Sequence, residues 1–214
     1  MQKRLFVCLL AAAALSLSSR DAAASEFTFG CITNNSAIDC GVLESQLLVT
    51  IGLNADNSSM VDFLFTNTGP AASSIADVYF DDPPPLLGAP GLISSSTGVS
   101  FTAGCAPGDL PGGAPYGFTT AYCADSDSPV QPNGVNPGEW LQLSYTLQGG
   151  ATLADVLEAI STGTFSVGIH VQGFDGGGSE SGVLTAQPVP EPASLVLLGS
   201  GAAAAFLRRR RRLA

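Results

Sequence analysis

The chain has 214 residues, enough for one domain of ordinary size, and 45% of them are hydrophobic, which is enough to build a core. The formal net charge is −10, and no Lys or Arg occurs between Ser25 and Leu207. Nucleic acid is therefore not an expected partner, because basic side chains must neutralise its phosphates. Without Lys or Arg, that stretch also cannot form a lysine Schiff base, an arginine clamp or a P-loop phosphate site.

Residues 1–24 have the pattern of a secretory signal peptide. Lys3 and Arg4 give a positive start, residues 5–17 are apolar, and three alanines precede Ser25. We expect signal peptidase to cut after Ala24. An uncut anchor helix is the alternative interpretation of the same pattern.

Residues 25–188 are predicted to form a secreted, mostly β domain. One helix is predicted, because Leu153, Val156, Leu157 and Ile160 follow helical spacing behind the N-cap candidate Thr152. Short apolar or alternating stretches bounded by Gly and Pro predict strands at 46–53, 60–66, 75–80, 99–102, 140–147, 164–172 and 183–186. This pattern favours an all-β fold, a two-sheet antiparallel sandwich of jelly-roll type with one short helix.

Four cysteines remain after removal of the signal peptide, and none forms a Cys-x-x-Cys pair. An even number in an exported chain indicates two disulfides, and four cysteines allow three pairings. We expect Cys31–Cys40 and Cys105–Cys123, because each pair encloses a turn-rich loop. A zinc site is not expected, because the chain has a single His.

Acidic residues gather in loops that resemble calcium-binding sequences only loosely. The calcium candidates are Asp77, Asp81, Asp82, Asp175 and Glu180, but no EF-hand spacing is present, and Asp and Gly also occur in loops because they suit turns. The preferred interpretation is a solvated acidic surface, with no metal and no cofactor. Asp125 and Asp127 form another acidic group.

No catalytic residue is predicted. His170 lies in a predicted strand without a recognisable nucleophile motif, and a carboxylate-based hydrolase is disfavoured by the few aromatic residues available to line a sugar cleft. Tyr116, Phe118 and Tyr122 lie on one loop, where they either stack on sugar rings or fix the loop to the core. Trp140 is expected in the core.

The C-terminal 26 residues have three parts. Pro190-Glu191-Pro192 is followed by an uncharged stretch, 193–207, and then by the run Arg208, Arg209, Arg210, Arg211 and Arg212. A helix over 193–207 would be about 22 Å long, which is short for the roughly 30 Å hydrocarbon core of a bilayer. The arginines would stay on the cytoplasmic side and leave the domain outside.

This tail, residues 189–214, resembles the PEP-CTERM protein-sorting signal of Gram-negative bacteria. The resemblance implies that an exosortase, a membrane-embedded enzyme, recognises the tail and removes it during export. It also implies an association with exopolysaccharide and with surface or biofilm material. The alternative is a tail-anchored domain on a proline-rich stalk.

Together these features predict an exported surface or matrix protein with a structural or adhesive role. The expected transient partners are signal peptidase and an exosortase, and extracellular polysaccharide is a candidate lasting partner. Contact with the membrane is expected only through the C-terminal hydrophobic helix before processing. A carbohydrate-binding module with a defined ligand is the main alternative.

Overall fold

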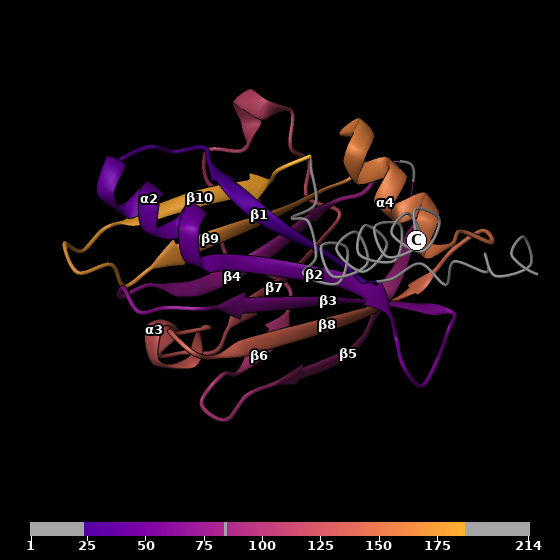
Figure 1. Cartoon of the computed structure of the whole chain (residues 1–214), viewed down its shortest axis with the longest axis horizontal. Helices are drawn as coiled ribbons and strands as arrows, with labels where there is room; N and C mark the ends of the chain where they lie inside the picture. The colour runs from indigo at the N-terminus through magenta and orange to yellow at the C-terminus, as the bar shows by residue number, and fades with distance from the viewer. Residues whose placement is uncertain (1–23, 84, 187–214) are drawn as a thin grey trace, which may run out of the picture.

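The computed structural model describes residues 24–83 and 85–186, and their fold is a curled antiparallel sheet (Figure 1). The strand order is β5-β8-β3-β2-β1-β10-β9-β4-β7-β6. The strands are β1 (Ser25–Cys31), β2 (Leu47–Leu53), β3 (Met60–Asn67), β4 (Ser74–Asp81), β5 (Leu87–Ser95), β6 (Phe101–Ala103), β7 (Tyr122–Ser126), β8 (Trp140–Leu147), β9 (Ser166–Gln172) and β10 (Ser179–Leu184). The predicted mostly β antiparallel fold is confirmed.

Strand β1 joins the two layers of the sandwich. Its first half, from Ser25 to Thr28, pairs with β2, and its second half, from Phe29 to Cys31, pairs with β10. The first layer therefore contains β5, β8, β3 and β2, and the second contains β10, β9, β4, β7 and β6. Figure 1 shows β1 lying between β2 and β10.

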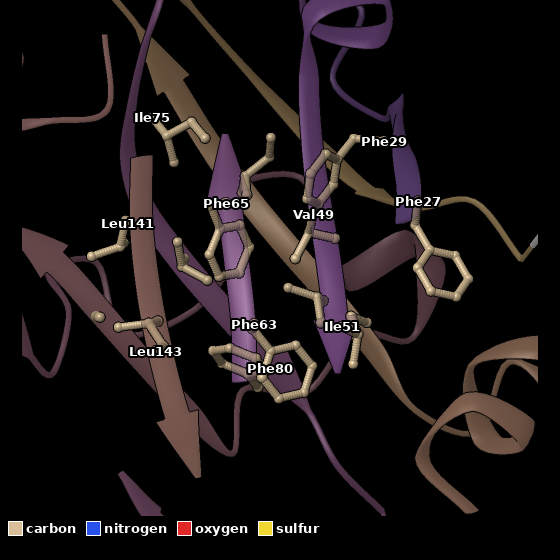
Figure 2. Close-up of a cluster of buried hydrophobic side chains, with 14 of the residues drawn as sticks. Phe27, Phe29, Val49, Ile51, Phe63, Phe65, Ile75, Phe80, Leu141 and Leu143 are labelled. Atoms are coloured by element: carbon tan, nitrogen blue, oxygen red, sulfur yellow. The ribbon is translucent and has the colours of Figure 1, made fainter. Parts of the chain in front are cut away.

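The core lies between the layers and is rich in phenylalanine. In β3, alternate residues from Val61 to Asn67 are buried, as the period of two requires for a strand with one inward face. The ring centroid of Phe63 lies 5.0 Å from that of Phe80 on β4, with the rings edge to face. Figure 2 shows this pair, with Val49, Ile51 and Leu143 on the neighbouring strands.

Helices cover parts of the sandwich. Among the described residues they are α2 (Ala37–Gln46), the four-residue α3 (Val130–Asn133), α4 (Leu153–Thr162) and the 3₁₀ turn η1 (Ala114–Tyr116). The helix predicted from Leu153 is α4, and it buries Leu153, Val156 and Ile160. Helix α2 was not predicted; it packs beside β1 and β10 and buries Leu43.

A long loop covers the outer face of the second layer. All residues of β4 except Asp81 are buried, although a strand with one solvated face should alternate. Tyr79 donates a hydrogen bond from its hydroxyl to the carbonyl of Pro107, at 3.2 Å. Leu110 packs on Gly168, where an added Cβ would lie 2.6 Å from the Leu110 Cδ2 atom. The loop between β6 and β7 is therefore part of the packed structure.

Within the described ranges, no helix is long and apolar enough to cross a membrane. The predicted signal helix and the predicted hydrophobic helix over 193–207 lie outside the described residues.

Candidate functional site

Both disulfides have the predicted pairing. Cys31 at the end of β1 is bonded to Cys40 in α2, and Cys105 is bonded to Cys123 in β7. The first disulfide ties α2 to the C-terminal end of β1. The second closes the loop that covers β4, so each disulfide fixes a segment outside the regular strand ladder.

Glu180, one of the calcium candidates, is a buried structural carboxylate. It is 1% exposed, and its oxygens accept hydrogen bonds from the backbone NH of Asn35 and Ser36 and from the hydroxyl of Thr33. These donors lie in the turn that leads into α2. Its oxygen also lies within 4.8 Å of the sulfurs of the first disulfide, but a disulfide offers no thiolate to a metal.

Three other calcium candidates lie apart from Glu180 and have separate environments. Asp82 is buried, and its two carboxylate oxygens accept hydrogen bonds from the backbone NH of Leu86 and Leu87, at 2.8 and 2.9 Å. Asp81 ends β4, opposite Ser166 of β9. Asp175 is exposed in the turn between β9 and β10. The five candidates therefore do not meet at one point.

The fifth candidate, Asp77, has a partner that sequence reasoning did not assign to it. Asp77 on β4 lies directly opposite Asp125 on β7, and their side chains are hydrogen-bonded to each other. Burial raises the pKa of Asp77 to about 7, with the hydrogen bond and the charge of Asp125 as further causes. The two residues are 48 positions apart, so only the strand register reveals the pair. No strand was predicted around Asp125, so the sequence offered no signal that it faces Asp77.

His170 lies on the other side of Asp77, because β9 pairs with β4 as well as with β10. Its Nδ1 atom is 3.1 Å from the hydroxyl of Ser181. Burial lowers the pKa of His170. Ser181 is fully buried, so this Ser–His contact does not present a nucleophile to a substrate.

The aromatic loop contributes to a cleft of about 420 Å³. Its walls include Asp81, Tyr116, Phe118, Thr164 and Ala186, the last of these at the end of the described chain. Tyr116 is 61% exposed, whereas Phe118 is half-buried.

Two aromatic residues considered in the sequence analysis, Tyr122 and Trp140, do not line the cleft. Tyr122 packs on Tyr145 and donates its hydroxyl hydrogen bond to the carbonyl of Leu87, so it is a packing residue and not part of the cleft. Trp140 was expected in the core, and this prediction was wrong. The side chain is 37% exposed, because its position in β8 alternates with the buried Leu141.

The sorting residues Pro190, Glu191 and Pro192 and the arginines 208–212 lie outside the described residues. In a comparison with protein-family models, residues 188–212 match the PEP-CTERM protein-sorting motif. Among curated proteins, none matches the chain significantly. The matched segment coincides with the predicted tail of 189–214 and confirms that prediction. The chain thus carries a PEP-CTERM protein-sorting motif, which implies an exported, membrane-transiting protein that an exosortase processes.

Proposed function

We propose that the domain of residues 25–188 is a structural or adhesive component of extracellular polysaccharide or biofilm material, delivered by its sorting motif. The observation that carries the proposal is the match to the PEP-CTERM motif at residues 188–212. A tail of this kind concerns delivery and says nothing of chemistry, so the role after delivery must come from the domain.

The domain has features that suit long residence outside the cell. Two disulfides close loops of the sandwich, and the core is continuous between the layers. Disulfides persist in oxidising surroundings and stabilise a domain chiefly by restricting its unfolded chain. The lack of Lys and Arg from 25 to 207 leaves the surface acidic, which keeps such a domain soluble and separate from other anionic polymers.

Non-enzymatic action is part of the proposal. The carboxylates of Asp82 and Glu180 are occupied by backbone NH donors, and Asp77 and Asp125 are in direct contact with each other. A glycosidase instead needs two carboxyl groups at least about 5 Å apart, on opposite sides of a sugar bond. The contacts of these four residues therefore favour structural roles for them.

A carbohydrate-binding module is the second candidate, and the cleft favours it. Tyr116 offers an exposed ring, Phe118 a second aromatic wall, and Asp81 a hydrogen-bond acceptor. A few polar groups beside aromatic walls are the usual composition of small-molecule sites. The glycan should be neutral or basic, because no Lys or Arg of the domain can pair with an anionic sugar.

The two roles are distinguished by removing one aromatic side chain. The exported protein is passed through gels containing neutral, anionic or cationic polysaccharide, and its retardation is measured. A binding module should lose retardation in Tyr116→Ala but keep it in Trp140→Ala, which removes an exposed aromatic ring of β8 outside the cleft. A general matrix component should show the same retardation in both variants as in the unmodified protein.

For a general matrix component, deleting the protein from its host should loosen the polysaccharide matrix. Retention of normal matrix in the deletion strain, with no polysaccharide retardation, would contradict both roles.

A further inference from the structure

We propose that the cleft beside Tyr116 binds residues 187–189 of the same chain, the segment that joins the domain to its sorting motif. The cleft has a volume of about 420 Å³, and Ala186, the last residue that the structure describes, forms part of its wall. The next residue, Gln187, therefore starts at the cleft. Because the segment is tethered there, its effective concentration at the cleft is high. The proposal does not depend on the role of the domain in the matrix.

Strand β1 fixes the place where the chain leaves the sheet. The backbone NH of Thr185 donates a hydrogen bond to the carbonyl of Thr28 at 3.0 Å, and the hydroxyl oxygens of these two residues are 3.1 Å apart. Leu184, the last residue of β10, also lines the cleft. Ala186 thus follows directly on an anchored residue, so the segment after it begins at the cleft wall.

The cleft walls have the composition that binds proline-containing segments. Tyr116 presents a ring that is 61% exposed, and Phe118 adds a second aromatic side chain. Ile160, Phe165 and Pro83 contribute further apolar surface. Grooves lined by aromatic side chains are the usual binding sites of proline-rich segments in the polyproline II conformation.

The segment has the matching chemistry. Residues 187–190 are Gln-Pro-Val-Pro and carry no charge. Proline fixes its own φ and disfavours the helical region for the residue before it, so this sequence favours an extended backbone. A segment that is already extended loses less conformational entropy when it binds. In polyproline II, three residues cover about 9 Å, at about 3.1 Å each.

Charge sets the point at which the bound segment ends. Asp81 lies in the cleft wall, and the amide group of Gln187 can donate a hydrogen bond to it. Glu191 carries the same charge as Asp81, and no Lys or Arg occurs between residues 25 and 207 to neutralise either carboxylate. Binding therefore stops before Pro190-Glu191-Pro192 and leaves this motif outside the cleft. The bound segment would fix the position at which an exosortase meets the motif.

Disulfide trapping tests the contact in the full chain, exported by a host that lacks an exosortase so that the tail remains. A disulfide requires Cα atoms within about 7 Å of each other. Thr164 is exposed in the cleft wall, so Thr164→Cys and Val189→Cys should be linked in peptide maps, whereas Ile38→Cys on α2 and Val189→Cys should not. The link should be lost on adding Tyr116→Ala and kept on adding Trp140→Ala. A link that survives Tyr116→Ala, or no link at all from Thr164→Cys, would overturn the proposal.

Nitration of tyrosine tests the same contact without added cysteines. Tetranitromethane modifies exposed tyrosine rings, and a bound segment should protect Tyr116. In Pro188→Gly with Val189→Gly, which keeps the sorting motif, we expect nitration of Tyr116 to rise several-fold. Nitration of Tyr122, which packs on Tyr145, should not change. Equal nitration of Tyr116 with and without the two substitutions would contradict the proposal. Protection of Tyr116 only by an added neutral oligosaccharide would assign the cleft to a sugar and also overturn it.

Discussion

Glu180 shows how one buried carboxylate can organise a segment distant in sequence. It accepts hydrogen bonds from Thr33, Asn35 and Ser36, in the turn between β1 and α2. The N-terminus of α2 follows directly, where a negative charge also interacts favourably with the helix dipole. Glu180, a calcium candidate in the sequence analysis, therefore has its oxygens occupied by the protein itself.

Replacing Glu180 should destabilise the domain. In Glu180→Gln one acceptor oxygen becomes an amide that faces NH donors, and the charge-assisted bonds are lost. We expect the free energy of unfolding to fall by about 2–3 kcal/mol, the usual effect for hydrogen bonds to a charged group. Urea unfolding measures it, with Asp175→Asn as the exposed control. A loss below about 0.5 kcal/mol would show that these bonds contribute little.

Leu110 lies so close to Gly168 that no side chain fits there. Replacing Gly168 by Ala should therefore lower the stability of the domain, whereas replacing Gly41 by Ala should raise it. In Gly168→Ala the new methyl group would meet the Leu110 side chain, which is itself buried, so we expect a loss of about 1–3 kcal/mol from overpacking. In Gly41→Ala, inside α2, nothing lies within 4 Å of the new atom, and a gain of about 0.5–1 kcal/mol is expected from helix propensity. Chemical denaturation of both variants checks the signs. A neutral Gly168→Ala would mean that the loop shifts freely.

At the scale of elements, the sequence pattern predicted most of the strands in which apolar residues alternate. Strand β1 was not predicted, although its buried residues Phe27 and Phe29 alternate with more exposed ones. Strands β3, β8 and β9 lie at or within two residues of their predicted bounds. Strand β5 was not predicted, because Gly88, Pro90 and Gly91 interrupt it; it tolerates them as the terminal strand of the sheet order. Strand β7 is short and includes Asp125, and pairing with β4 and β6 overrides its weak propensity.

Helix α2 and the acidic pair were hidden for different reasons. Helix α2 contains Gly41, Val42 and a half-cystine, which are poor helix formers, and its stability comes from packing and the disulfide. The contact between Asp77 and Asp125 depends on register across two strands, which no local pattern encodes. The aromatic loop was recognised from the sequence. Only the structure shows that Tyr116 lines the cleft whereas Tyr122 packs on Tyr145.

Helix α4 has a capping box that should respond to mutation and to acid. The Thr152 hydroxyl accepts from the backbone NH of Asp155, and the Asp155 carboxylate accepts from the backbone NH and hydroxyl of Thr152. Thr152→Ala should cost about 1 kcal/mol. These hydrogen bonds lower the pKa of Asp155, so its contribution is present at neutral pH and is lost as the pH falls below the ordinary range of Asp. Comparing unfolding of Thr152→Ala and the unmodified protein at pH 7 and at acid pH measures this. An equal gap at both pH values would contradict the box.

At the scale of the whole molecule, the two disulfides limit the freedom of the unfolded chain. The linked cysteines are 9 and 18 residues apart. In the chain-entropy model, closing loops of these sizes stabilises by roughly 2.5 and 3 kcal/mol. Replacing Cys105 and Cys123 together by Ala should therefore lower the free energy of unfolding by about 3 kcal/mol, slightly more than replacing Cys31 and Cys40. Denaturant unfolding of both double variants tests this, and a negligible loss in either would show that its loop is already ordered in the unfolded state.

Export with processing of the tail is the central claim, and one measurement addresses it most directly. Mass spectrometry of the intact protein from the surface or medium of a host that has an exosortase gives both termini at once. We predict that the chain begins at Ser25, lacks Arg208–Arg212 and retains both disulfides, and that deleting the exosortase leaves the arginines in place. An exported protein that still carries Arg208–Arg212 in the exosortase-containing host would contradict the account.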